Sequence, residues 1–147
     1  MRVGLLFLCL AAPVLAADLT GTWIGAMVTS DQRRPPQDIA FQFDQDGAAL
    51  AGKQYGDELS SPIQDGSVSD KEIRFNVVIR EQAGNQINDV LYRFEGSSEG
   101  DALLLTRERA SAQDSVSGAP VPVRRPDDND EQDRARRFHT FRLEKLF

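Results

Sequence analysis

The chain contains only one cysteine, one histidine and one tryptophan among its 147 residues. The cysteine, Cys9, lies in an apolar N-terminal stretch, so the residues after it form neither a disulfide nor a thiolate metal site. A single histidine, His139, excludes multi-histidine metal sites and leaves one candidate base for a serine triad. Neither a Gly-x-Ser-x-Gly elbow nor a glycine-rich phosphate loop occurs. We therefore expect no enzyme, no metal site and no cofactor.

Long apolar runs are also missing after the N-terminus. Residues 1–16 are typical of a secretory signal peptide, with Arg2 as a short positive region, an apolar stretch over 3–10, and small residues before a cut after Ala16 or Ala17. The apolar stretch is too short for a membrane-spanning helix. These features predict a secreted or periplasmic protein without a transmembrane segment.

Basic residues are in the minority, because 17 Lys and Arg stand against 23 Asp and Glu, for a net charge of −6. This balance argues against nucleic acid as a partner, since nucleic-acid-binding domains usually carry a basic patch. The most acidic run, 127–131, lacks the glycine and the spaced glutamate of a calcium-binding EF-hand loop. We expect a solvated acidic loop there.

What the sequence does contain is a series of short alternating strands. In 72–81, for example, Ile73, Phe75 and Val77 alternate with polar or charged residues, which predicts a strand with one buried face. Asp46 and Gly47 give the strongest hairpin signal, because a tight primed turn needs positive φ. The predicted strands are 20–29, 38–45, 48–55, 60–64, 67–69, 72–81, 87–95, 101–108 and 136–145, with turns at 46–47, 65–66, 70–71, 83–85 and 96–100.

About eight antiparallel strands without a helix need a solution for their edges. Closure into an eight-stranded up-and-down β-barrel removes both edges. The last strand then has to pair with the first across residues 110–137, a polar stretch with three prolines that is either a mobile insertion or an ordered lid. The prediction is a single all-β barrel domain over 18–147 with a long insertion at 110–137.

Gly21, Thr22 and Trp23, just after the leader, resemble the Gly-x-Trp signature of lipocalins and of the related avidin-type (calycin) barrels. Together with 41–47, 50–52, 63–68 and 73–75, they are similar to small secreted bacterial lipocalin-like domains, and the likeness covers 18–109 and 138–146. The resemblance implies a barrel and export, and no activity. Avidin boxes biotin with several tryptophans, so one tryptophan argues against biotin. In lipocalins an arginine of the final strand covers this tryptophan, which implies a closure set of Gly21, Trp23 and Arg142, with Arg107 as the alternative arginine.

Aromatic side chains on the predicted inward faces form the candidate ligand site. They either line an apolar pocket with Tyr92 as a polar handle, or fill the core. We expect an exported, non-catalytic barrel that binds a small apolar or amphipathic ligand. The alternative is a packed barrel whose loops bind an extracytoplasmic protein or polymer, as an inhibitor does. The candidate ligand-binding residues are Trp23, Phe41, Phe43, Phe75, Tyr92 and Phe94.

Overall fold

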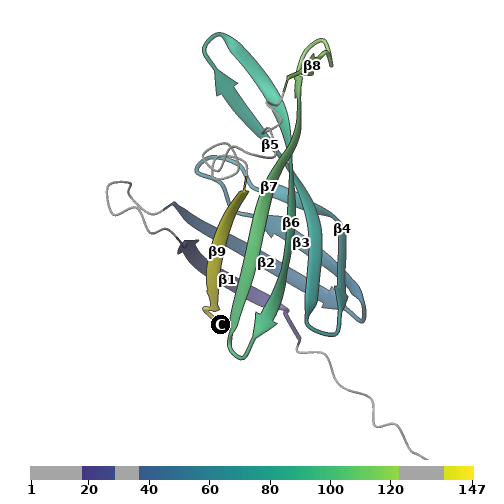
Figure 1. Cartoon of the computed structure of the whole chain (residues 1–147), viewed down its shortest axis with the longest axis vertical. Coiled ribbons are helices and arrows are strands. Elements are labelled where there is room, and N and C mark those ends of the chain that lie inside the picture. Colours follow the sequence, from purple (N-terminus) through teal and green to yellow (C-terminus); the bar gives the residue numbers. More distant parts are fainter. Residues whose placement is uncertain (1–17, 29–36, 123–137) are drawn as a thin grey trace, which may run out of the picture.

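The computed structural model describes residues 18–28, 37–122 and 138–147, and these hold nine β-strands (Figure 1). The predicted leader at 1–16 lies outside them. No helix capable of crossing a membrane occurs in the described part of the chain. The strands are β1 Gly21–Met27, β2 Asp38–Asp46, β3 Ala49–Gln54, β4 Ser61–Ser69, β5 Glu72–Ala83, β6 Gln86–Glu99, β7 Ala102–Asp114, β8 Pro120–Val121 and β9 Phe138–Lys145.

Eight of these strands close into an antiparallel barrel. Each of β1 to β6 pairs with the next strand in sequence. β7 then pairs with β9, and β9 pairs with β1, which closes the ring. At the closing seam Trp23 lies opposite Lys145, and Met27 lies opposite Phe141. The predicted eight-stranded up-and-down barrel, closed by its last strand on its first, is confirmed. The two-residue strand β8 lies outside the ring.

The inward faces of the strands carry the alternating apolar residues, and the middle of the barrel is filled with phenylalanine. Phe41, Phe43, Phe75 and Phe94 are almost fully buried, and their ring centroids lie 4.8–5.5 Å apart in stacked and edge-to-face pairs. Phe141 of β9 is equally buried. Burying each such ring stabilises the fold by about 1.5–3 kcal/mol. The core therefore occupies the centre of the barrel.

Trp23 closes one end of the barrel, which we call the base. The indole is 4% exposed, and its Nε1 donates to the carbonyl oxygen of Leu19 at 2.8 Å. The Leu19 amide in turn donates to Gln45 Oε1. The cation facing the Trp23 ring is Lys145, whose Nζ lies 5.9 Å from the ring centroid, within the range of a cation–π contact.

The cation expected over Trp23 was an arginine, and here the structure differs. Arg142 lies between the inward-facing Phe141 and Leu143 on β9 and is exposed, because side chains alternate across a strand. Arg107 lies toward the other end of the barrel, opposite His139 rather than opposite Lys145. The final strand does supply the cation, but from Lys145, three residues beyond the predicted position.

The turn predicted at 65–66 is wrong, and the turn predicted at 96–100 begins too early, because β6 runs to Glu99 and the chain turns at Gly100 and Asp101. Residues 65–66 form a bulge inside the continuous strand β4 instead of a turn between two strands. Asp65 takes up the extra residue at φ 51°, and Gly66 lies so close to β3 that a Cβ would be 1.9 Å from the Leu50 carbonyl oxygen. Gly96 likewise lies within β6, where a Cβ would be 1.9 Å from the Leu104 carbonyl oxygen. In both places glycine permits close strand approach and does not end the strand.

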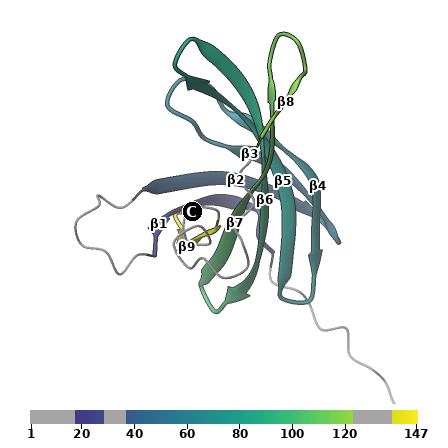
Figure 2. The same cartoon turned by 45° about the horizontal axis from the view of Figure 1, so that its top comes forward.

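The predicted insertion begins later than expected. β7 runs to Asp114 and turns into β8, so the strand prediction that ended at 108 is too short, and of 110–137 only 123–137 lie outside the described residues. β5 also continues to Ala83, beyond Val77, its last residue that pairs with β4. The upper parts of β5, β6 and β7, together with β8, therefore project beyond the barrel as a small sheet (Figures 1 and 2).

β8 and β9 lie along the same side of β7. Val121 pairs with Ala112, and Phe138 pairs with Glu108, both antiparallel to β7. Only three positions of β7, 109–111, lie between these two pairings, whereas the sixteen residues 122–137 link the two strands in sequence. The closing strand is thus one interrupted strand, and the insertion lies at the interruption.

Candidate ligand site at the barrel mouth

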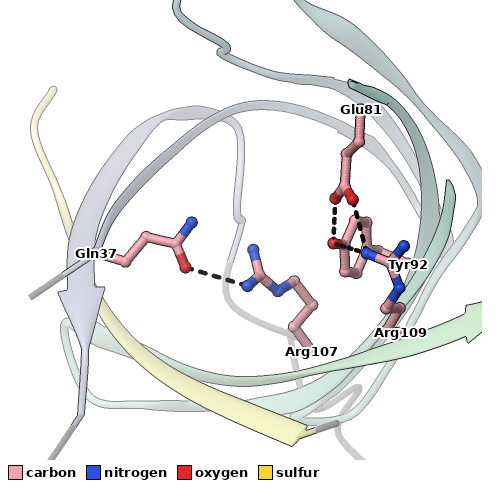
Figure 3. Close-up of polar contacts among 5 residues, drawn as sticks. All are labelled: Gln37, Glu81, Tyr92, Arg107 and Arg109. Carbon is pink, nitrogen blue, oxygen red and sulfur yellow. Dashed lines mark hydrogen bonds and ion pairs between the residues drawn. The ribbon is translucent and has the colours of Figure 1, made fainter. Parts of the chain in front are cut away.

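The end of the barrel opposite Trp23, which we call the mouth, has polar side chains directed inward. Figure 3 shows them within the ring of strands. The buried residues in the middle are apolar, and the two buried polar residues of the described chain, Asn88 and Arg107, lie toward this end. The mouth residues drawn there are Gln37, just before β2, Glu81 of β5, Tyr92 of β6, and Arg107 and Arg109 of β7.

Arg107 is the most unusual of these residues. It follows Leu103 and Leu105 on the inward face of β7 and is only 8% exposed. Its guanidinium carbon lies 4.8 Å from the ring centroid of Tyr92 and 5.0 Å from that of Phe141. The guanidinium is therefore held between two aromatic rings, where cation–π attraction offsets part of the cost of leaving water.

The hydrogen bonds of Arg107 are incomplete. Nη2 donates to Gln37 Oε1 at 3.1 Å, whereas the buried Nε has no partner among the described residues. No carboxylate of the described chain forms an ion pair with it. Burial lowers the pKa of Arg107 from its ordinary value, because a buried cation loses its hydration. The mouth thus holds a buried positive charge whose only polar partner here is a neutral amide.

Arg109, two residues farther along β7, is in the opposite situation. Its Nη1 donates to Glu81 Oε2 at 2.7 Å and to the Tyr92 hydroxyl at 3.1 Å. The Tyr92 hydroxyl donates to the other carboxylate oxygen of Glu81. Burial, together with this hydrogen bond to Glu81, raises the pKa of Tyr92. These three side chains satisfy one another and fix the wall of the mouth (Figure 3).

Two further buried oxygens in this half of the barrel have no hydrogen-bond partner among the described residues. They are Gln54 Oε1 on β3 and Asn88 Oδ1 on β6. A buried unpaired polar group costs about 1–3 kcal/mol, so most folds satisfy such groups. Both side chains lie toward the mouth end of their strands, since Gln54 ends β3 and Asn88 lies near the start of β6. Within the described part of the chain, these oxygens therefore leave hydrogen-bonding capacity unused at this end.

Apolar side chains accompany the polar ones. Met27, Ile63 and Ile79 are half-buried and pack against the core from β1, β4 and β5. By register they lie beside Phe141, Val77 and Val90 respectively, on the mouth side of the phenylalanine core. The mouth therefore has both apolar surface and unused donors and acceptors, which is the usual make-up of a small-molecule site.

The structure separates the six predicted ligand-binding residues into three groups. Phe41, Phe43, Phe75 and Phe94 form the packed core, and their predicted inward direction is confirmed. Trp23 lies at the base. Tyr92 alone reaches the mouth.

Sequence reasoning missed the functional position of Arg107, Arg109, Glu81 and Gln37. A signal was present, because Arg107 continues the inward register of Leu103 and Leu105, and a charged residue on a buried face is a mark of a site. The resemblance to lipocalins indicated Trp23 and its covering arginine instead.

A hollow with a volume of about 820 Å³ lies at the base. Trp23 and Leu19 form its floor, and its charged lining residues, Asp18, Glu99, Asp101, Arg142, Glu144 and Lys145, are exposed and of both signs. Water already solvates such groups, so the hollow offers less driving force for binding than the mouth.

Metal binding finds no support in the parts of the chain that the structure describes, which contain no group of three metal-ligating side chains. The acidic run at 127–131 lies outside those parts. His139 is half-buried on β9, opposite Arg107 in register. Comparison with models of protein families, with curated proteins and with solved structures finds no match to this chain.

Proposed function

We propose that this chain is an exported, non-catalytic barrel of the lipocalin-like type that binds a small amphipathic molecule at its mouth. One observation carries the proposal: Arg107 is buried between two aromatic rings, and its Nε has no partner among the described residues. A buried polar group without a hydrogen-bond partner lowers the stability of the fold. Ligand binding is a common reason why a protein retains such a group. Export rests on the leader-like sequence of residues 1–16.

The packed core supports a shallow site over a deep one. Five phenylalanines fill the middle of the barrel with almost no exposed surface, and eight-stranded barrels have little interior to spare. A ligand would therefore rest on this floor, with its apolar part against Met27, Ile63 and Ile79.

The arrangement of the carboxylate supports a binding role over a catalytic one. Glu81 accepts hydrogen bonds from Tyr92 and from Arg109, which hold it in place. A carboxylate so engaged is a poor general base, because an effective base needs free access to the proton that it removes.

The test is binding of amphiphiles to the mature chain, followed by two-dimensional ¹⁵N NMR. The fluorescence of Trp23 is a poor reporter because the indole lies at the base, whereas the side-chain Nε–H of Arg107 is at the mouth. Octanoate, octanamide and octanol are the probes. Shifts of the Arg107 Nε–H and of amides near Tyr92, without shifts near Trp23, are expected. No shift with any probe, and no co-purifying mass in native mass spectrometry, would count against the proposal.

A second candidate function is protein binding through the loops, and two exposed apolar residues favour it. Leu59 in the β3–β4 loop is 80% exposed, and Val116 in the β7–β8 turn is 93% exposed. Loops carry a disproportionate share of the residues with which proteins bind their partners. Capture of a partner by the wild type but not by the double variant L59S/V116S would support this function. The control is Ile24→Ser, on the outer face of β1, and equal capture by all three would argue against it.

A further inference from the structure

The guanidinium of Arg107 presents one edge that is only half used. Nε–H and one N–H of Nη2 point in the same direction, which is the fork that binds two oxygens of one acceptor group. In the structure Nη2 donates to a single oxygen, Gln37 Oε1, and Nε beside it donates to none of the described residues (Figure 3). Of the two nitrogens on this edge, Nη2 has a partner among the described residues and Nε has none.

The charges around this edge are also incomplete. Arg109 is paired with Glu81 at 2.7 Å, so that carboxylate is already engaged. The acceptor at Arg107 is a neutral amide. A buried guanidinium is most stable beside an anion, because the anion replaces the lost hydration of the cation. Among the described residues, no carboxylate lies within ion-pair distance of Arg107.

From this geometry we infer that the ligand at the mouth is a small monocarboxylic acid, whose two carboxylate oxygens take the Nε and Nη2 positions of Arg107. The inference rests on the function proposed above. The carboxylate is planar and matches the fork, and its single charge matches that of Arg107, which forms no ion pair with the described residues. The neighbouring Tyr92 and Phe141 rings and the half-buried Met27, Ile63 and Ile79 favour an alkyl or aryl body.

Gln37 Oε1 competes for Nη2, one of the two nitrogens that a carboxylate would use. The Gln37 side chain comes from the start of β2 and is exposed, so it can withdraw into water when the acid enters. Gln37→Ala removes this competitor, and octanoate should then bind about fivefold more tightly, the usual worth of one net hydrogen bond. Gln37→Glu places a carboxylate of the chain itself at Arg107, and octanoate binding should then be lost.

The experiment measures the affinities of octanoate, octanamide and inorganic phosphate for the mature chain by calorimetry. The wild type should prefer octanoate over octanamide by at least about tenfold, since hydrogen bonds to a charged group are worth that much. Arg107→Gln should remove the preference, and Arg107→Lys should retain only part of it, because an ammonium cannot form the fork. Arg93→Gln, on the outer face of β6, is the matched control and should behave as wild type.

Several outcomes would overturn the inference. Equal affinity of the wild type for octanoate and octanamide would leave the proposed function standing and remove the carboxylate from it. Tighter binding of phosphate than of octanoate would do the same. No binding of any amphiphile would reject both proposals. If Arg107→Gln does not fold, Gln37→Glu decides, because undiminished octanoate binding to that variant is incompatible with a carboxylate at Arg107.

Discussion

Arg107 and Arg109 lie two residues apart on β7 and face the same end of the barrel, yet they differ in electrostatic environment. Arg109 is half-exposed and has a carboxylate partner. Arg107 is buried, and it contacts two aromatic rings and donates a hydrogen bond to the side-chain amide of Gln37. The inward register of Leu103 and Leu105 extends to both arginines and does not distinguish them. The difference depends on Glu81 and Gln37, which reach them from elsewhere in the chain.

Tyr92 makes the alkaline stability of the protein testable at the level of one residue. Its pKa is raised in the folded state, chiefly by burial and then by Glu81, so the folded protein holds this proton more tightly than the unfolded chain does. Its contribution is therefore complete below the ordinary tyrosine pKa near 10 and is lost as pH rises through the raised folded value. Denaturant unfolding of wild type and Tyr92→Phe at increasing alkaline pH should show a steeper loss for the wild type.

A direct titration checks the same point. The chain has two tyrosines, so the variant Tyr55→Phe leaves Tyr92 as the only source of tyrosinate absorbance. That absorbance should develop at a higher pH than in free tyrosine. Parallel loss of stability in wild type and Tyr92→Phe would contradict the assignment.

At the scale of strands, hydrophobic alternation correctly predicted which residues face inward, whereas glycine was a poor guide to where the strands end. β5 was predicted well because Ile73, Phe75 and Val77 repeat every second residue. Gly66 and Gly96 were interpreted as turn residues, although each lies within a strand, where the neighbouring backbone comes too close for a Cβ. That requirement arises from the partner strand and is invisible in the local sequence.

The interrupted last strand predicts that the insertion is dispensable for folding. Replacing 122–137 with three residues should join β8 to β9 as one strand opposite 109–111 of β7, because the register leaves three positions to fill. A shorter connection also costs less loop entropy. We expect equal or greater stability in urea, with unchanged amide protection along β9. Loss of the folded state would show that the connecting residues support the barrel.

Considered as a whole, the molecule has a closed base, a filled middle and a polar mouth, and the filled middle can be tested. Phe75 is 2% exposed and contacts Phe41, Phe43 and Phe94. Phe75→Ala should lower the free energy of unfolding by about 3–5 kcal/mol, because it leaves a cavity among the rings. Urea denaturation measures this loss, and Leu59→Ala, at an exposed loop position, should change it by less than about 0.5 kcal/mol. Similar losses in the two variants would mean that the core is loosely packed.

The closing seam gives a second test of the whole barrel. A Cβ on Gly25 would lie 2.0 Å from the Arg142 carbonyl oxygen, so Gly25→Ala has to push β9 away from β1. We expect a loss of about 1–3 kcal/mol and faster amide hydrogen exchange at the seam, for example at the Leu146 amide, which donates to the Thr22 carbonyl. Gly47→Asn is the control, since nothing lies within 4 Å of that position and asparagine tolerates positive φ. Exchange that accelerates evenly over all strands would argue against a local seam effect.

The seam also has a consequence for how the chain reaches its native state. β1 and β9 come from opposite ends of the described chain, so their pairing is among the most distant contacts in sequence, and such contacts form slowly. Because synthesis proceeds from the N-terminus, a chain that pairs its strands as they emerge has β1 and most of β7 without their ring partner until β9 is made. Unpaired strand edges are where chains aggregate. We therefore expect the arrival of β9 to limit the rate of folding and to mark the end of the period in which the nascent chain is vulnerable to aggregation.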